Sequence, residues 1–243
     1  MPDLNRRQMI QRSFCGLAAG TFGTLTLDAK AAPTPETPDV HDYESYLDKK
    51  GIPQVAPAEK WEPSFKDILG PFYVPGAPFR GKVTAPLAEG DPLVIRGRIW
   101  GYDTKKPIPT AILDVWQADA HGNYDMNNPK NPPKWKDFKN RIRLKVDETG
   151  YYEYETIKPG SYGIGNGQSR PSHIHYMIQA PGYNKLITQL YFKGDPHIKT
   201  DSFGDKGAAN SNLIIQTEKV KVKGGSYQLG TFDIVLASTA ASL

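Results

Sequence analysis

The sequence predicts an all-β fold: a β-sandwich with long irregular loops and a proline-rich N-terminal arm. Short runs of β-branched and aromatic residues recur along the chain and are bounded by turn-forming segments. The chain contains 23 glycines and 21 prolines, and no stretch between these runs has the spacing of an amphipathic helix. Its 243 residues are a usual length for one large all-β domain.

Residues 1–31 predict a signal peptide of the twin-arginine type. Arg6 and Arg7 precede a weakly apolar stretch, which ends at 29–31 in AKA, an A-x-A cleavage pattern. An amphipathic N-terminal helix is the alternative, although the apolar stretch lacks a charged face. We therefore expect a bacterial protein that is exported to the periplasm or the medium and keeps no membrane anchor after processing.

Residues 32–90 predict an arm that wraps over the core. Proline is frequent in this segment, and proline excludes regular helix and central strand. Its most aromatic part is GPFYVPGAPFR at 70–80. We expect the sandwich domain itself to occupy residues 91–243.

Within the sandwich domain, eight runs have strand character, and hairpin turns are expected at 147–150 and 223–226. The runs are PLVIRGRIW (92–100), TAILDVWQA (110–118), RIRLKV (141–146), YYEYETI (151–157), SHIHYMIQA (172–180), LITQLYF (186–192), NLIIQTEKVKV (212–222) and TFDIVLA (231–237).

The composition excludes several kinds of site. The formal net charge is +4 and the basic residues are interspersed with acidic ones, so nucleic acid is not an expected partner. Cys15 is the only cysteine, which rules out a disulfide framework and a thiolate metal site. Any metal must therefore be held by His, Tyr, Asp or Glu.

Two of the five histidines, His173 and His175, lie one residue apart in the run SHIHYMIQA. Successive side chains of a strand point to opposite faces, so these two imidazoles share one face. They are close enough to bind one metal ion, but hydrogen-bonding histidines would show the same pattern. The motif alone leaves both interpretations open. We expect the other three histidines, His41, His121 and His197, at the surface.

Several phrases, taken in order, resemble the intradiol ring-cleavage dioxygenases. They are GPFYVPGAP, IPTAILDVWQADAHGNYD, ETGYYEYETIKPGSY, RPSHIHYMIQAPG, KLITQLYFKGDP and TFDIVLA, and they extend over roughly residues 65–237. Within this family, the amino-acid sequence of these segments most resembles the β-type chain of protocatechuate 3,4-dioxygenase. The resemblance implies that residues 91–243 form a catalytic β-sandwich that cleaves a catechol with dioxygen.

The resemblance implies one non-haem Fe(III) per chain, held by two tyrosinates and two histidines. Position by position, the ligands fall on Tyr124 in HGNYD, Tyr162 in TIKPGSY, and His173 and His175 in RPSHIH. Phenolates are hard anionic donors that suit Fe(III), and imidazole binds iron well. The chain has 13 tyrosines, so either tyrosine taken singly would be interpreted as a packing residue.

The family reaction inserts both atoms of O2 into a catechol and gives a cis,cis-muconate-type product. By resemblance, Tyr162 is the axial ligand that the catechol displaces, and it takes up a substrate proton. Arg170 matches an arginine beside the substrate ring, where a fixed cation stabilises negative charge; a surface salt bridge is the alternative. Gln189 matches a glutamine that orients the substrate. Asp114 and Trp116 are expected to be structural.

One position departs from the family pattern. Protocatechuate enzymes place a tryptophan two residues after the axial tyrosine, near the bound substrate, whereas this chain has Ile164. The expected substrate-binding residues are therefore Ile164, Arg170 and Gln189, and protocatechuate itself is not the expected substrate. The sequence leaves open which catechol is used and whether the chain assembles as a homo-oligomer or with an unlike chain.

Two other functions fit parts of the sequence. Cupin-like metalloproteins also carry His-x-His on a strand, but their next ligand is a glutamate a few residues on, where this chain has Gln179 and Ala180. An exported β-sandwich binding module that has lost its iron would lack a ligand, and all four matching ligands are present here.

Overall fold

A computed structural model describes residues 61–126, 130–134, 137–201, 208 and 210–239 of the chain. These residues belong to one compact unit, Glu44–Leu243. The predicted signal peptide, residues 32–60 of the predicted arm, and His41 lie outside the described residues, so these expectations stay predictions.

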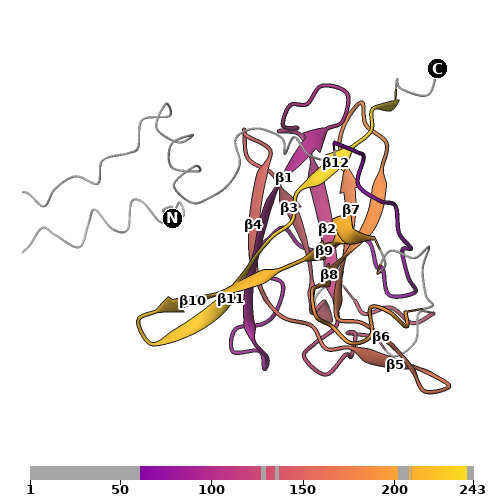
Figure 1. Cartoon of the computed structure of the whole chain (residues 1–243), viewed down its shortest axis with the longest axis vertical. Coiled ribbons are helices and arrows are strands. Elements are labelled where there is room, and N and C mark those ends of the chain that lie inside the picture. The colour runs from indigo at the N-terminus through magenta and orange to yellow at the C-terminus, as the bar shows by residue number, and fades with distance from the viewer. Residues whose placement is uncertain (1–60, 127–129, 135–136, 202–207, 209, 240–243) are drawn as a thin grey trace, which may run out of the picture. The chain divides into compact units, whose positions relative to one another are not determined.

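Two five-stranded sheets and one two-stranded sheet make up the fold (Figure 1). The first sheet has the order β10–β11–β1–β12, and β4 pairs with β1. Its strands are β1 (Pro92–Gly101), β4 (Tyr151–Ile157), β10 (Thr217–Val222), β11 (Gly225–Thr231) and β12 (Ile234–Leu236). The second sheet has the order β3–β2–β7–β8–β9. Its strands are β2 (Ile112–Gln117), β3 (Arg141–Lys145), β7 (His173–Gln179), β8 (Leu186–Phe192) and β9 (Ile214–Ile215). The small sheet pairs β5 (Tyr162–Gly165) with β6 (Gln168–Arg170).

The main core lies between the two large sheets. β1 and β4 contribute Ile95 and Tyr154, and β7 contributes Ile174, Tyr176 and Ile178, each at most 1% exposed. The hydroxyls of Tyr154 and Tyr176 are hydrogen-bonded to each other across the two sheets. Two sheets that pack face to face over a shared apolar core form a β-sandwich, so the predicted fold class is confirmed.

The second sheet is covered on its other face as well. His173, His175 and Met177 alternate along β7 with the core residues and are only 2%, 1% and 6% exposed. The chain before β1 crosses this face, where the backbone N–H of Asp67 donates to the carbonyl of Ile187 in β8 at 2.9 Å. Burial on both sides explains why β7 lacks a simple alternation of polar and apolar residues.

A turn forms at 147–150, but the hairpin predicted there is wrong. Gly150 N–H donates to the carbonyl of Asp147 at 3.0 Å, and the Asp147 carboxylate accepts the N–H groups of Thr149 and Tyr151. However, β3 pairs with β2 while β4 pairs with β1, so this turn carries the chain from one sheet to the other. A hydrophobic pattern shows which strand face is buried, whereas tertiary packing selects the partner strand.

Three strands are missing from the sequence-based prediction: β5, β6 and β11. Their sequences, YGIG, QSR and GSYQLGT, are rich in glycine and polar residues and lack the apolar alternation that reveals a strand. The hairpin turn predicted at 223–226 is confirmed, because β10 and β11 pair antiparallel around it. The predicted strand at 212–222 is divided into a 3-10 helix, η4 (Ser211–Leu213), followed by β9 and β10 in different sheets.

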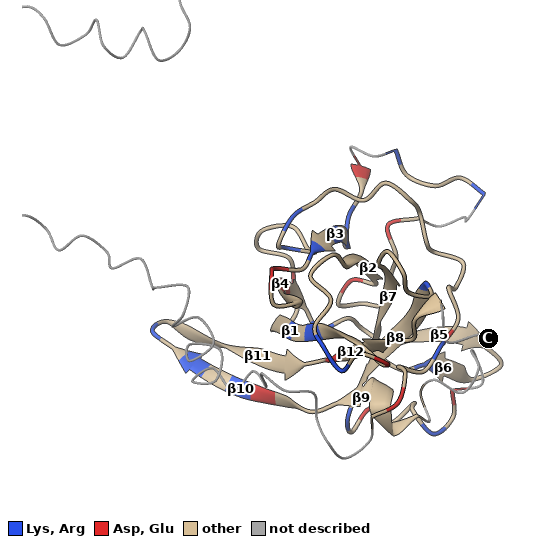
Figure 2. Cartoon of the chain, turned by 90° about the horizontal axis from the view of Figure 1, so that it is seen from above, with Lys and Arg blue, Asp and Glu red and all other residues tan. Residues whose placement is uncertain are grey.

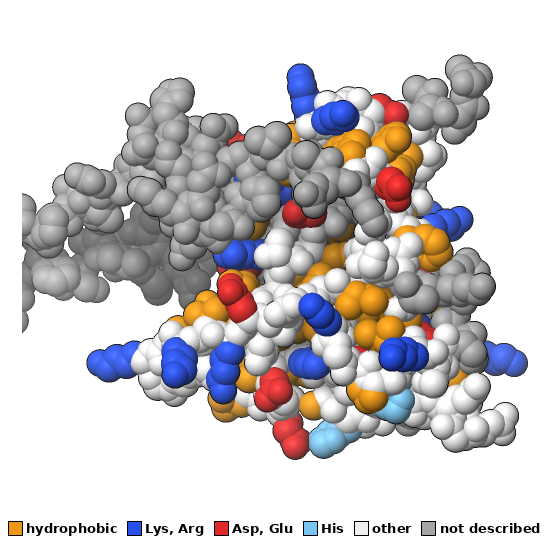
Figure 3. All heavy atoms as spheres, in the orientation of Figure 1, with side chains coloured by type: hydrophobic (Ala, Val, Ile, Leu, Met, Phe, Trp, Pro, Cys, Tyr) orange, Lys and Arg blue, Asp and Glu red, His pale blue; other side chains and the backbone are white. Residues whose placement is uncertain are grey.

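The charged residues of both signs are interspersed on the faces that Figures 2 and 3 show. The β10–β11 hairpin of the first sheet projects beyond the other strands in both ribbon views (Figures 1 and 2), and Figure 2 shows basic residues along it. Among the described residues, no helix has the length and apolarity needed to cross a membrane.

Candidate active site

Strand β7 places the two predicted histidine ligands in the middle of the covered face. It pairs with β2 on one side and β8 on the other, so His175 lies in register between Trp116 and Gln189. The Trp116 indole stacks on the His175 ring, with centroids 4.8 Å apart and planes at 4°. His173 lies opposite Tyr191 of β8. Trp116 thus directly supports the ring of a predicted ligand.

The ring nitrogens of the two histidines converge with a tyrosine hydroxyl. Nε2 of His173 lies 3.2 Å from Nε2 of His175 and 3.3 Å from the hydroxyl oxygen of Tyr124. Nδ1 of His173 lies 2.6 Å from the carbonyl oxygen of Pro171, so Nδ1 must be the protonated nitrogen that donates this hydrogen bond. The Nε2 lone pair of His173 therefore faces His175 and Tyr124.

Tyr162, the first residue of β5, completes the group. Its ring is edge-on to that of Tyr124, with centroids 5.9 Å apart, and the two hydroxyls are hydrogen-bonded. Its ring centroid lies 5.7 Å from that of His173. The structure therefore brings all four predicted ligands together, from β7, from β5 and from the loop after β2.

Glycines let the two loops that carry the tyrosines touch. Gly122 has φ +84°, and a Cβ at this position would lie 2.5 Å from the carbonyl oxygen of Ser161 and 2.8 Å from Cβ of Tyr162. In addition, Gly160 N–H donates to the carbonyl of Asp119 at 2.8 Å, and the Asp119 carboxylate accepts N–H groups of its own loop. The glycine in HGNYD thus permits the close approach of the two tyrosines.

Burial sets the charge states of these four side chains. Burial, with a contribution from Arg170, lowers the pKa of His173 to about 3, and burial also lowers the pKa of His175 well below its usual value. Both imidazoles are therefore neutral at pH 7, as metal ligation requires. Burial raises the pKa of Tyr124 and Tyr162 above the usual value, whereas a bound cation would lower it.

The chemistry of this donor set fits one metal ion. Two neutral imidazole nitrogens face each other at 3.2 Å with the Tyr124 hydroxyl beside them, and a cation would satisfy all of these donors at once. Two phenolates would offset two positive charges, which suits a hard and highly charged ion such as Fe(III). Nδ1 of His175 is buried and has no hydrogen-bond partner among the described residues.

Arg170 and Gln189 lie beside the four ligands and contact each other. Arg170 ends β6 and is 2% exposed, and its Nη2 donates to Oε1 of Gln189 at 3.1 Å. Arg170 lies near Tyr162, and it pairs with Asp201 through Nε at 3.3 Å and Nη2 at 3.0 Å. Its salt bridge is therefore buried, and the surface salt bridge considered as its alternative role is wrong. Burial lowers the pKa of Arg170, but Asp201 and the nearby tyrosines raise it more.

Comparison with known protein families identifies the chain's relatives. A family model described as Dioxygenase matches residues 68–238. The chain belongs to the intradiol ring-cleavage dioxygenase family. The predicted family is thus confirmed.

Curated members of this dioxygenase family match most of the chain. The chlorocatechol 1,2-dioxygenase of Rhodococcus opacus is 35% identical over 189 residues, which cover 70% of each protein. The 6-chlorohydroxyquinol 1,2-dioxygenase of Cupriavidus pinatubonensis is 34% identical over 188 residues, which cover 71% of this chain and 64% of the relative. The chain therefore spans slightly less than two thirds of the second relative's length.

Solved structures of dioxygenases share the fold. The dioxygenase domain of a dioxygenase–carbohydrate-binding protein fusion from Streptomyces sp. SirexAA-E is 31% identical with a TM-score of 0.59, and the match covers 73% of this chain and all of that domain. The 3-chlorocatechol 1,2-dioxygenase of Rhodococcus opacus 1CP is 27% identical with a TM-score of 0.64, and the match covers 81% of this chain and 79% of that one.

The segment before β1 contributes dioxygenase-site contacts that the sequence analysis did not assign. Phe72 stacks on Tyr124 with centroids 4.0 Å apart and planes at 13°. Gly70 has φ +70°, and a Cβ there would lie 3.2 Å from Cε1 of His175. Gln189 Nε2 donates to the carbonyl of Ile68 at 3.3 Å. The aromatic phrase GPFYVPGAP was the only sequence signal for this role.

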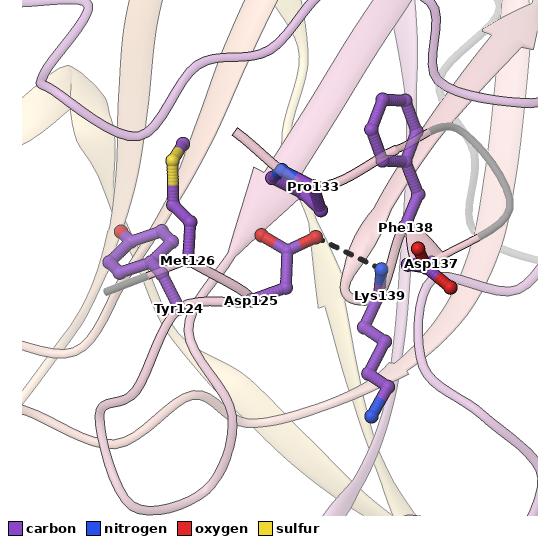
Figure 4. Close-up of a pocket in the computed structure, with 7 residues that line it drawn as sticks. All are labelled: Tyr124, Asp125, Met126, Pro133, Asp137, Phe138 and Lys139. Atoms are coloured by element: carbon purple, nitrogen blue, oxygen red, sulfur yellow. Dashed lines mark hydrogen bonds between the residues drawn. The ribbon is translucent and has the colours of Figure 1, made fainter. Parts of the chain in front are cut away.

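A cavity of about 600 Å³ borders Tyr124 (Figure 4). Figure 4 shows the Asp125 carboxylate near the centre of the lining, where its Oδ2 accepts the N–H of Lys139 at 3.0 Å. A cavity of this size accommodates a small organic ligand. The lining residues are Tyr124, Asp125, Met126, Pro133, Asp137, Phe138 and Lys139.

Ile164 lies half-buried on β5, two residues after Tyr162. A bulge between Gly163 and Gly165 interrupts the strand alternation there, so its predicted contact with substrate stays a prediction. Among the other histidines, His121 is exposed, as expected for a surface residue, and His197 is half-buried.

Proposed function

We propose that this chain is an intradiol ring-cleaving dioxygenase that binds one non-haem Fe(III) through Tyr124, Tyr162, His173 and His175. The observation that carries the proposal is the buried convergence of these side chains, in which Nε2 of His173 lies 3.2 Å from Nε2 of His175 and 3.3 Å from the Tyr124 hydroxyl. The relatives named for chlorocatechol and chlorohydroxyquinol support a catecholic substrate.

The proposed reaction combines one catechol with one O2. The bond between the two hydroxylated ring carbons breaks, and each of these carbons gains one oxygen atom, which gives a cis,cis-muconate-type dicarboxylate. When bound, the ferric ion would chelate the catechol dianion and make its ring reactive toward dioxygen.

Three of the ligands have a holding role. Tyr124 and the two histidines are at most 9% exposed, so we expect them to keep their positions when the substrate enters. Trp116 stacks on the ring of His175, and Phe72 stacks on the ring of Tyr124. These contacts restrict the rotation of the His175 and Tyr124 rings. Such packing preorganises the donors and excludes water from them.

Tyr162 has a proton-transfer role. A catechol held as a dianion would lose two protons. The Tyr162 oxygen, as a phenolate, would be a base strong enough to accept one of them, and the other would go to solvent hydroxide. Burial raises the pKa of Tyr162, but the charge of the nearby Arg170 lowers this pKa and so favours the phenolate form. Tyr162 is half-buried, so its side chain has more room to leave than that of Tyr124.

Arg170 and Gln189 have roles at the substrate ring. The Arg170 guanidinium is buried and fixed, so it would stabilise negative charge on the ring as the bond to oxygen forms. The Gln189 amide donates one hydrogen bond to the carbonyl of Ile68 and accepts one from Arg170. Because an amide NH2 has two donors, one N–H remains to orient the substrate.

The deciding experiment combines colour, oxygen uptake and product labelling. The protein loaded with ferrous iron in air should become red-brown with a broad visible band, and the band should shift on anaerobic addition of catechol. It should then consume one O2 per catechol, and both atoms of 18O2 should enter the product. Tyr154→Phe removes a buried hydroxyl outside the site and should change none of these results. A protein that stays colourless and consumes no oxygen would contradict the proposal.

The natural substrate and the cellular location need their own tests. Turnover of catechol, 4-methylcatechol, hydroxyquinol and protocatechuate would rank the substrates, and Ile164→Trp should increase the relative rate with protocatechuate if Ile164 contacts the ring. Export through a twin-arginine signal predicts a mature N-terminus near Ala32, which N-terminal sequencing of the exported protein would show. An intact Met1 on the exported protein would contradict a cleaved signal.

A further inference from the structure

The Arg170 guanidinium is enclosed by buried acceptors. Its Nε and Nη2 donate to the two carboxylate oxygens of Asp201 at 3.3 and 3.0 Å, and the side chains of this pair are only 3% and 0% exposed. Two hydrogen bonds to one carboxylate define the plane of a guanidinium as well as its position. Asp201 is 31 residues away from Arg170 in the sequence.

A second group of contacts connects Arg170 with the segment before β1. Arg170 Nη2 donates to the hydroxyl of Tyr191 at 3.1 Å, and the same hydroxyl donates to Oδ2 of Asp67 at 2.8 Å. Tyr191 is 0% exposed and Asp67 is 3% exposed. The hydroxyl therefore uses both its acceptor and its donor capacity, and its orientation is fixed by the carboxylate behind it.

These contacts restrict the movement of the Arg170 guanidinium beside the four predicted ligands. Nη2 is shared among Gln189, Tyr191 and Asp201, and Arg170 pairs in register with Tyr162 between β6 and β5. A long arginine side chain otherwise loses considerable rotamer entropy when it is held in one geometry. Here the surrounding acceptors hold it before any substrate arrives.

We propose that Asp201, Tyr191 and Asp67 are positioning residues that hold the Arg170 guanidinium in its productive orientation beside Tyr162. None of the three needs to touch the substrate, because each acts through Arg170. Asp201 sets the plane of the guanidinium, and the Tyr191–Asp67 pair prevents Nη2 from turning away from the site. The role in turnover rests on the proposed ring-cleavage function, whereas the effect on Arg170 does not.

The first test measures turnover per bound iron in isosteric variants. Tyr191→Phe should lower kcat by about tenfold or more, since a misplacement of a catalytic group by about 1 Å costs up to 100-fold. Asp67→Asn should lower kcat in the same direction by a smaller factor. The matched control is Tyr154→Phe, which also removes one buried tyrosine hydroxyl and its hydrogen bond but lies on the first sheet, in the main core. It should leave kcat and KM within about twofold.

The second test needs no iron and reports on Arg170 directly. In the iron-free protein, the Nε–H signal of Arg170 in an arginine-selective NMR spectrum, assigned through Arg170→Lys, should be dispersed and slow to exchange. Asp201→Asn should abolish this protection and Tyr191→Phe should shift the signal, whereas Tyr154→Phe should leave it unchanged. If Asp201→Asn does not fold, the Tyr191→Phe spectrum decides.

The outcomes separate this proposal from the proposed function. A wild-type protein without ring cleavage would contradict the function, while the NMR signals would still show whether Arg170 is held as proposed. A wild-type protein that cleaves catechol, together with a Tyr191→Phe variant of unchanged kcat and an unshifted Arg170 signal, would overturn the positioning roles.

Discussion

The two tyrosines that converge on the histidines have different surroundings. Tyr124 is 9% exposed, Phe72 stacks on its ring at 4.0 Å, and the next residue, Asp125, forms an ion pair with Arg141 in which both side chains are 2% exposed. Tyr162 is half-buried and begins a two-stranded sheet with a bulge in its first strand. One tyrosine is thus fixed by the core of the fold, and the other is carried by a small peripheral sheet.

Under the proposed function, this difference would let one site keep a metal and still exchange a ligand. The Tyr124 loop is joined to β3 by the ion pair and to the segment before β1 by an Arg141 hydrogen bond to the carbonyl of Phe72 at 3.0 Å. Tyr162 is on the short β5, which pairs only with β6 among the described strands, so fewer strand contacts restrain it than restrain the core of the fold. Under the proposed function, this difference in packing would suit Tyr124 to a holding role and Tyr162 to an exchanging role.

The largest expected effect is that of Tyr124→Phe. The variant loses an anionic donor from a fixed position that no other side chain can fill, so we expect iron content to fall at least about tenfold, with loss of the visible band and of turnover. Metal analysis after dialysis, with wild type in parallel, measures this. Full iron occupancy in the variant would show that Tyr124 is not a ligand.

The comparison predicts a different result for Tyr162→Phe. This variant should retain iron, because three ligands remain in place, but its kcat should fall by about 100-fold, because the base that takes a catechol proton is gone. Metal analysis and steady-state oxygen uptake per iron measure the two effects separately. Unchanged turnover in Tyr162→Phe would show that Tyr162 takes no part in the mechanism. Equal iron loss in Tyr162→Phe and Tyr124→Phe would show that the two tyrosines do not differ in their role.

A third prediction concerns the ion pair behind Tyr124. Asp125→Asn leaves the Arg141 guanidinium buried without its counter-charge, so we expect the free energy of unfolding to fall by about 3–5 kcal/mol. Chemical denaturation measures this. The matched control is Glu155→Gln, which breaks the exposed pair between Lys82 and Glu155 and should cost less than about 1 kcal/mol. If both variants lose a similar amount of unfolding free energy, the buried ion pair behind Tyr124 stabilises the protein no more than an exposed one does.

The smallest expected effect compares two glycines with similar backbone angles. Gly122 has φ +84° and Gly165 has φ +92°, but a Cβ at Gly122 would lie 2.5 Å from the carbonyl of Ser161, whereas a Cβ at Gly165 meets nothing within 4 Å. Both alanine variants carry the cost of a positive φ, about 1 kcal/mol. Gly122→Ala should cost about 1–3 kcal/mol more and weaken iron binding. Equal unfolding free energies for the two alanine variants would show that the loops carrying Tyr124 and Tyr162 can move apart without a loss of stability.

The sequence predicted the fold class, the family and the four candidate ligands, because each rests on a local pattern or on phrases read in order. The alternation in β7 placed His173 and His175 on one face opposite Ile174 and Tyr176, and the structure has this arrangement. The turn at 147–150 was also predicted, but not that it joins two sheets, because local residues fix a turn and only packing fixes strand partners. The strands β5 and β6 were missed, because both are very short: β5 is half glycine, and β6 has only polar side chains.

The sequence by itself therefore determined which residues have the chemistry for the site, and the tertiary structure decided how these residues are held. Asp201 lies 31 residues from Arg170, and Asp67 lies 124 residues from Tyr191, yet both carboxylates complete the same buried group of hydrogen bonds. Nothing in the local sequence marks either carboxylate, because an aspartate in a loop is usually solvated. Only the packing of the segment before β1 across the second sheet removes water from Asp67 and makes its hydrogen bond to Tyr191 structurally important.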